Sequence, residues 1–191
     1  MTASPADLLA LEQLPGRDVL LLDLEQATRA AHASKRPLSV LALDVDHFKD
    51  YQDQHALHEA SQALARLAKE LQAHLPPSGA LYHLSGDEFI VLLPDVALPD
   101  AAALAETLRA DVADALATEQ LTVTLGVAST PAHTDWSARG LLSLADARMT
   151  FAKKRLNPHH NLIWAGALPS DWYLRLDIEA KLWPQLETHL A

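Results

Sequence analysis

The fold is decided by the stretch His83-Leu84-Ser85-Gly86-Asp87-Glu88-Phe89-Ile90-Val91-Leu92-Leu93. Its two apolar halves, Leu81–Leu84 and Phe89–Leu93, have the composition of strands, and the polar turn between them contains a glycine. The stretch therefore predicts a β-hairpin that carries two acids, Asp87 and Glu88, at its tip. An ordinary solvated turn would explain such a tip as well as a functional site would, so the surrounding sequence has to decide between them.

Composition limits the class of protein. The 191 residues fit one domain with an extension, and 49% hydrophobic residues are enough for a core. A net charge of -10 argues against binding a nucleic-acid polymer through a basic face. Because there is no cysteine, disulfides and thiolate metal sites are excluded. No apolar run could span a bilayer, and Met1–Gln13 has no basic residue, so we expect a cytoplasmic protein without a membrane contact.

Hydrophobic periodicity predicts helices that alternate with strands. The order is helix, strand, helix, hairpin, helix, strand, helix and strand, which predicts an α/β (α+β) fold with a mixed or antiparallel central sheet covered by helices. Asp18 is expected to cap the first helix, and the stripe that begins at Leu57 is expected to face the core. The predicted units are a lead-in and helix (1–36), a catalytic domain (37–165) and a C-terminal helical extension (166–191).

The C-terminal extension has its own apolar stripe. Leucine or isoleucine recurs every four residues from Leu174 to Leu190, which predicts a helix that Pro184 kinks. The stripe must be buried, either on the same domain or on a second chain. A protein partner that docks through this helix is therefore one of the two expectations.

Two carboxylates are expected to meet at one edge of the sheet. Asp44 ends a predicted central strand and Asp87 lies at the hairpin tip, so they converge if the two elements are neighbours. Hard divalent ions such as Mg²⁺ prefer carboxylate, carbonyl and phosphate oxygens. The two acids and the Val45 carbonyl could hold one or two such ions, and Lys49 and Lys153 could balance phosphate charge. This set of residues suits phosphoryl or nucleotidyl transfer.

Several motifs in this order resemble the GGDEF domain, the catalytic module of diguanylate cyclases, here with an SGDEF signature. The resemblance spans roughly Leu11 to Trp164. It rests on Leu43-Asp44-Val45-Asp46-His47-Phe48-Lys49, Ser85-Gly86-Asp87-Glu88-Phe89, Val123-Thr124-Leu125-Gly126-Val127-Ala128, and the segment from Leu144-Ala145-Asp146 to Ala152-Lys153. It implies a palm-like nucleotidyl cyclase fold whose hairpin carries the signature.

The resemblance also implies an activity and its residues. Family enzymes are transferases that join two GTP into the signalling nucleotide cyclic di-GMP with Mg²⁺ (or Mn²⁺), and a homodimer is needed for catalysis. Carried over, the metal ligands would be Asp44, Val45 and Asp87. The catalytic residues would be Asp87, Glu88 and Lys153. The nucleotide-binding residues would be Phe48, Lys49, Gln52, Ser61, Ser85 and Gly86.

Departures from the family pattern concern the base and one phosphate contact. Gln52 and Ser61 stand where the family has Asn and Asp, and a serine hydroxyl cannot accept two N–H bonds as a carboxylate does. In having a serine at position 61, the chain resembles a minority branch of the family that also accepts ATP. This resemblance would imply relaxed base choice. Leu156-Asn157-Pro158 replaces the usual Gly-Arg-Asn, so a phosphate-contacting arginine is absent unless Arg155 substitutes for it.

Three functional hypotheses follow from these residues. The first is an active cyclase, which the intact acids favour. The second is a degenerate domain that binds a nucleotide without turnover, and the third is a module that binds a protein partner. Asp46 has two interpretations, as a metal ligand or as a residue that holds its loop by local hydrogen bonds. A calcium loop is excluded because Lys49 stands where its glycine is required.

Overall fold

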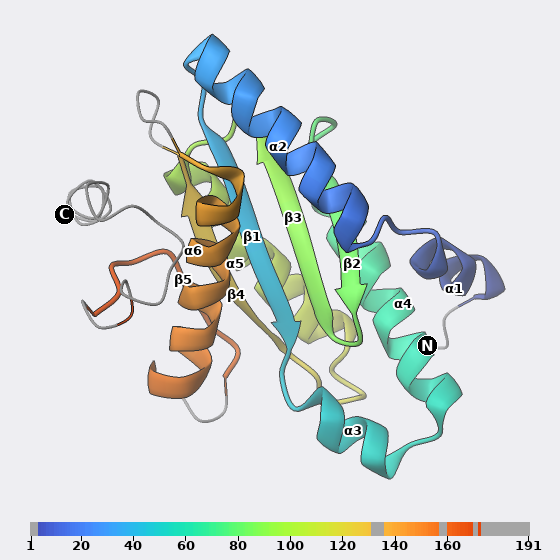
Figure 1. Ribbon diagram of the computed structural model, residues 1–191. Coiled ribbons are helices and arrows are strands. Elements are labelled where there is room, and N and C mark those ends of the chain that lie inside the picture. The colour runs from blue at the N-terminus through green and yellow to red at the C-terminus, as the bar shows by residue number, and fades with distance from the viewer. Residues whose placement is uncertain (1–3, 131–135, 157–159, 170–171, 173–191) are drawn as a thin grey trace.

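A five-stranded sheet forms the centre of the computed structural model, which describes residues 4–130, 136–156, 160–169 and 172 (Figure 1). The strand order is β2 (Ala80–Ser85), β3 (Glu88–Pro94), β1 (Leu38–Val45), β4 (Val123–Ser129) and β5 (Ile163–Trp164). The pairs β2–β3, β3–β1 and β1–β4 are antiparallel, whereas β5 runs parallel to β4. The mixed sheet confirms the predicted fold class.

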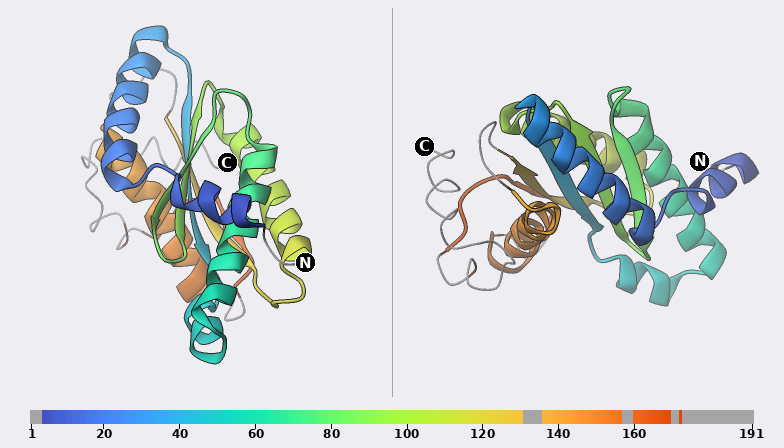
Figure 2. Two further views of the ribbon diagram at one scale, coloured as in Figure 1. Left: turned by 90° about the vertical axis from the view of Figure 1, so that its right-hand side faces the viewer. Right: turned by 45° about the horizontal axis from the view of Figure 1, so that its top comes forward.

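Helices cover both faces of the sheet. Figure 2 shows α2 (Arg17–Ser34) and α6 (Ala138–Phe151) on one face, and α4 (Leu57–His74) and α5 (Leu98–Ala115) on the other. Each face has its own apolar core, and the side chains of β1 and β3 alternate between the two cores. The central strand β1 is therefore buried on both sides, which explains its almost continuous apolar sequence.

Two helices were missed by the sequence analysis. The first is α1 (Pro5–Glu12), where Ser4 and Asp7 form a capping box ahead of Pro5. It packs against α4. The second is α3 (Phe48–Gln54), which follows β1 directly. Seven residues are too few to show an apolar stripe, and α1 lay in a segment that its proline suggested to be irregular.

Two local predictions were wrong. Helix α2 starts at Arg17 with Gly16 as its N-cap, so Asp18 lies in the first turn and caps nothing. Leu57 is 79% exposed and does not belong to the buried stripe of α4, which begins at Ala60. As the first residue of α4, Leu57 has no preceding turn to bring it against the sheet. The predicted C-terminal helix lies largely outside the described residues.

The approach of α6 to β4 is set by one glycine. A Cβ atom on Gly126 would lie 2.0 Å from the carbonyl oxygen of Ala145 and 2.3 Å from the amide nitrogen of Met149. The helix therefore lies directly against the strand, and it continues into a π-helical turn, η1 (Ala152–Leu156). In the described parts of the chain, no helix is both long and apolar enough to cross a bilayer.

Candidate active site

The end of β1 and the tip of the β2–β3 hairpin lie side by side, as predicted (Figure 1). Asp44 is directly opposite Glu88 in the antiparallel register, so both side chains leave the same face of the sheet. The Val45 N–H donates to the Asp87 carbonyl oxygen over 3.2 Å. This bond holds the main chain of the signature turn against the strand that carries Asp44.

The signature turn has a backbone conformation that its glycine allows. Gly86 has a φ of 51°, and no atom lies within 4 Å of the position that a Cβ would occupy. The ring of His83 stacks on Phe89 with 4.5 Å between centroids, and its Nε2 lies 2.9 Å from the Gly86 carbonyl oxygen. Because a carbonyl can only accept, Nε2 is the protonated nitrogen. Ser85 is exposed, and its hydroxyl is 3.4 Å from Glu88 Oε2.

Asp44 is the most perturbed acid of the site. Its side chain is only 18% exposed, and burial raises the pKa of the carboxyl to about 6. The hydrogen bond and the positive charge of Lys153 oppose this rise, while the nearby charges of Asp87 and Asp46 add to it. Lys153 forms an ion pair with Asp44 Oδ1 from the π-helical turn η1. The Asp44 carboxylate is therefore incompletely solvated, and a second cation besides Lys153 would stabilise its charge.

The contacts of Asp46 favour its interpretation as a residue that holds its loop over its interpretation as a metal ligand. The side chain is 1% exposed. Its Oδ1 accepts from the Thr124 hydroxyl, and its Oδ2 accepts from the Thr122 hydroxyl and the Asn161 N–H, each over 2.8 Å. Both oxygens are thus engaged with the protein, and the residue anchors the turn between β1 and α3.

Asn161 and Arg109 belong to the same network and were missed by the sequence analysis. The Asn161 side-chain oxygen accepts from Arg109 of α5 over 2.9 Å, while its main chain bonds to Asp46. Asn161 has a φ of 57° and precedes β5. No spacing in the sequence links these residues, which lie far apart along the chain.

A cavity of about 250 Å³ lies against Glu88, between the sheet and α6. Arg17, Ser143 and Asp146 line it together with Glu88 and apolar side chains. Burial raises the pKa of Asp146, as does the charge of Glu88, while Arg17 and Lys154 lower it. Glu88 therefore borders a charged cluster at the mouth of this cavity, in which Arg17 and Asp146 are exposed residues that the sequence analysis did not assign to the site.

Four of the predicted nucleotide-binding residues lie on the two helices that follow β1, and the other two, Ser85 and Gly86, lie in the signature turn. Lys49 and Gln52 are exposed on α3, whereas Phe48 is 2% exposed and packs in the core. Ser61 lies in the second turn of α4, and its hydroxyl donates to the Leu57 carbonyl over 3.1 Å. That bond uses the proton of the hydroxyl and leaves its oxygen as an acceptor.

The donor chemistry fits a divalent ion that shares its ligands with a substrate. Asp44 and Asp87 supply carboxylate oxygens, and Val45 can supply a carbonyl. In the described residues, no three His, Cys, Asp or Glu side chains form a complete metal site on their own. Mg²⁺ commonly keeps only one or two protein carboxylates and completes its shell with water and phosphate oxygens. Two acids at the edge of the sheet therefore suit Mg²⁺ or Mn²⁺ bound together with a nucleotide.

Comparison with known proteins identifies the family. The model described as diguanylate cyclase, GGDEF domain, matches residues 9–158. The chain belongs to the GGDEF family. It is 33% identical over 141 residues to the uncharacterized protein YhcK of Bacillus subtilis, covering 68% of this chain and 39% of that protein. It is 32% identical over 152 residues to diguanylate cyclase TpbB of Pseudomonas aeruginosa, covering 76% of this chain and 35% of that protein.

Solved structures agree with this assignment. The active GGEEF domain of a diguanylate cyclase from Vibrio cholerae superimposes on this GGDEF chain with a TM-score of 0.73 and 27% sequence identity. The match covers 81% of this chain and 100% of the other. The two curated relatives are more than twice as long as their matched parts, so what those whole proteins do is not carried over with the domain.

Proposed function

We propose that this protein is a diguanylate cyclase that condenses two GTP into cyclic di-GMP and releases pyrophosphate. The observation that carries the proposal is the meeting of Asp44 and Asp87 at adjacent strand ends, with Lys153 beside them. A dead nucleotide-binding domain has no need to keep this set of acids. Because GTP is the substrate, the proposal places the reaction in the cytoplasm.

The roles proposed for the residues are those that the family resemblance implies, and the positions of the acids and of Lys153 support them. Asp44, Asp87 and the Val45 carbonyl would hold Mg²⁺ or Mn²⁺, which stabilises charge on the phosphate oxygens. Lys153 would contact phosphate once a metal ion replaces it at Asp44, and exposed Lys49 would contact the terminal phosphates. Ser85 and Gly86 would lie against the nucleotide through their main chain. Glu88, opposite Asp44, would help to hold the metal ion or to accept a proton.

The proposed reaction needs two copies of the chain. The 3′-hydroxyl oxygen of one GTP attacks the α-phosphorus of the other, forming an O–P bond as the bond to the β-phosphate oxygen breaks. Pyrophosphate leaves, and the hydroxyl proton passes to a carboxylate or to water. The same step repeated in the opposite sense closes the ring. Each site holds one GTP, so a homodimer brings the two nucleotides face to face.

Base choice is expected to be relaxed. Gln52 and Ser61 take the places of the family's base-reading Asn and Asp, and the Ser61 hydroxyl already donates to the Leu57 carbonyl. A single acceptor oxygen discriminates less between guanine and adenine than a carboxylate that accepts two N–H bonds. Ser61→Asp is therefore expected to raise the ratio of GTP to ATP incorporation by about tenfold. An unchanged ratio would show that Ser61 does not face the base.

The decisive experiment is mass spectrometry of the products formed from mixed GTP and ATP with Mg²⁺ or Mn²⁺. Cyclic di-GMP is expected, with a smaller amount of mixed product. Asp87→Ala is expected to abolish it, whereas Asp114→Ala, on the exposed side of α5, is expected to leave it unchanged. No cyclic dinucleotide with either metal, at any protein concentration, would contradict the proposal.

Nucleotide binding without turnover is the second candidate. It is favoured by the altered base-reading residues and by Leu156-Asn157-Pro158, which lacks the family's arginine. Calorimetry would then show metal-dependent binding of GTP in a protein that forms no product. A domain that binds neither GTP nor ATP would instead point to a protein-binding role, for which the C-terminal extension is the candidate surface.

A further inference from the structure

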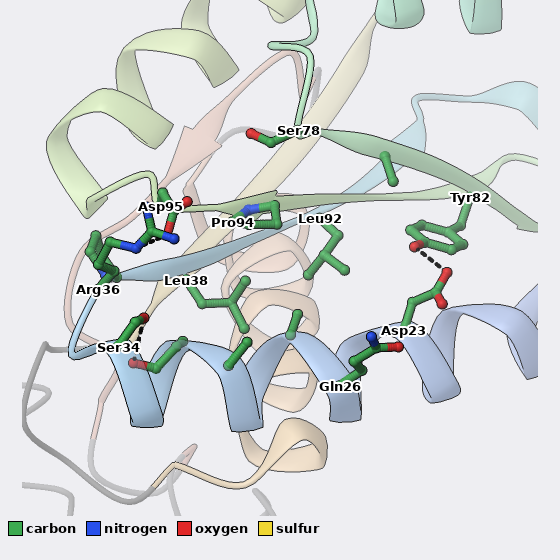
Figure 3. A pocket seen from close by; sticks show the side chains of 15 residues that line it. Asp23, Gln26, Ser34, Arg36, Leu38, Ser78, Tyr82, Leu92, Pro94 and Asp95 are labelled. Carbon is green, nitrogen blue, oxygen red and sulfur yellow. Dashed lines mark hydrogen bonds and ion pairs between the residues drawn. The ribbon is translucent and has the colours of Figure 1, made fainter.

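A second cavity lies between α2 and the sheet, away from the acids (Figure 3). Its volume is about 430 Å³, within the range of roughly 300–1,000 Å³ that is typical of small-molecule sites. Its walls expose mainly apolar surface, and α2 contributes alanines where larger residues would fill the space. The apolar lining includes Ala27, Ala31, Leu38, Ala80 and Leu92.

Polar groups gather at one end of this cavity. Tyr82 of β2 is 1% exposed, and its hydroxyl donates to Asp23 Oδ2 of α2 over 2.8 Å (Figure 3). Because the phenol has only one proton and donates it to Asp23, the phenol oxygen and the Asp23 carboxylate can both accept a further hydrogen bond. Gln26, one turn further along α2, adds an amide to the same end. This end of the cavity therefore offers a carboxylate, a phenol oxygen and an amide oxygen to a donor.

The charge of the lining is negative. At the opposite end, Arg36 forms an ion pair with Asp95 over 2.9 Å, so these two charges cancel (Figure 3). Tyr82 stays neutral, since burial and the bond to Asp23 raise the pKa of its phenol. Asp23 is then the one lining charge without a cation beside it in the described chain.

We propose that this cavity binds a small organic cation, a protonated amine or amidine on an aliphatic or aromatic body. The cationic N–H groups would donate to Asp23, and such charge-assisted hydrogen bonds are stronger than neutral ones. The body would lie on the alanine and leucine walls, where burying apolar area is favourable. The site shares no residue with the acid cluster, so this proposal does not depend on cyclase activity.

Titration followed by ¹H–¹⁵N NMR and calorimetry tests this proposal on the full chain. The probe is 2-phenylethylamine, and phenylacetate serves as a probe with the same aromatic body and the opposite charge. Saturable binding of the amine is expected, with shifts concentrated at Ala27, Ala31 and Tyr82. Phenylacetate is expected to cause no saturable shift.

Variants separate the charge from the shape of the cavity. Asp23→Asn is expected to weaken amine binding at least tenfold, whereas Asp18→Asn, on the same helix but outside the cavity, is expected to leave it unchanged. Ala27→Leu should weaken binding by filling the space, with Asp23 intact. The NMR spectrum of each variant shows whether it is folded.

Three outcomes would overturn the proposal. The first is the absence of saturable shifts with the amine. The second is equal binding of phenylacetate or equal binding to the Asp23→Asn variant, since either would remove the role of charge. The third is a concentration-dependent dimer that Ala30→Arg disrupts, which would assign this groove to a second copy of the chain.

Discussion

Asp44 shows how a single side chain joins stability to function. Its carboxyl is largely buried, and Lys153 offsets only part of the cost of its charge, so its pKa is about 6 against 3.8 in an ordinary aspartate. Between these two values the folded protein binds a proton that the unfolded chain does not. Stability from this group is therefore fully present below about pH 4 and is lost as the pH rises through about 6. Above that value the site carries a charge that a metal ion would neutralise.

The pKa of Asp44 predicts that metal binding depends on pH. Below about pH 6 a metal ion must displace the proton, so Mn²⁺ affinity is expected to fall by up to tenfold for each pH unit. Above pH 7 the affinity should change little. Calorimetric titration of Mn²⁺ between pH 5 and 8 measures this, and Asp44→Asn is the control that should bind weakly at every pH. A flat affinity profile across that range would argue against Asp44 as a ligand.

The contacts of Asp46 predict a loss of stability rather than of metal binding. Asp46→Ala removes the acceptor of two hydroxyls and one main-chain N–H, at about 1 kcal/mol for each bond. We expect urea unfolding to show about 3 kcal/mol of destabilisation. Thr122→Val, which removes one of the bonds, should cost about 1 kcal/mol. Mn²⁺ affinity that falls as far as in Asp44→Asn would instead make Asp46 a ligand.

At the scale of elements, the site depends on how closely α6 approaches β4. The absence of a side chain at Gly126 lets the helix lie on the strand, and the π-helical turn after α6 then delivers Lys153 to Asp44. On the other side of β1, the hydrogen bond from Val45 to Asp87 brings the signature turn to the same place. Helix packing at Gly126 therefore positions Lys153, and the hydrogen bond from Val45 positions Asp87, on opposite sides of β1.

Gly126→Ala is predicted to disturb this arrangement severely. Its Cβ would overlap main-chain atoms of α6, which cannot move aside as a flexible side chain could. We expect about 3 kcal/mol or more of destabilisation in chemical unfolding, with loss of nucleotide binding. Gly86→Ala is the matched control, because its Cβ meets open space and only the positive φ costs about 1–2 kcal/mol. Equal costs for the two variants would refute this account.

At the scale of the molecule, the acids form half of the proposed reaction centre. The acids lie where β1 ends, and no element of the described fold would place a second nucleotide opposite them. The 430 Å³ cavity lies elsewhere, between α2 and the sheet, and is built from a different part of the hairpin. The proposed cation cavity and the acid cluster are therefore separate, and only the acid cluster is tied to the family's chemistry.

Dependence on a second copy predicts the kinetics. If two sites must face each other, turnover per chain is expected to rise with protein concentration and then level off as the dimer saturates. Mixing Asp87→Ala with an excess of wild-type protein should lower activity only in proportion to the mixed dimers. Mass-spectrometric product assays over a dilution series measure this. Constant turnover per chain down to the lowest dilution would require either a very tight dimer, visible by sedimentation, or a different reaction.

Local patterns along the chain were enough to predict the fold class, the hairpin and the family. Strand and helix periodicities are local properties, and a run of motifs in a fixed order can be recognised without coordinates. The same local rules missed α1 and α3, and they misplaced Leu57, because short elements have little periodicity and a helix end has no preceding turn to define its face.

Which polar residues contact one another became clear only from the packing of distant elements. Asp46, Asn161 and Arg109 form one network although more than a hundred positions separate the first two, and Lys153 reaches Asp44 over a similar separation. The cavity beside Asp23 likewise arises where alanines of α2 face Ala80 of β2. Burial, the raised pKa of Asp44 and the shape of a cavity all depend on which surfaces are excluded from water, and that is settled only when distant elements pack.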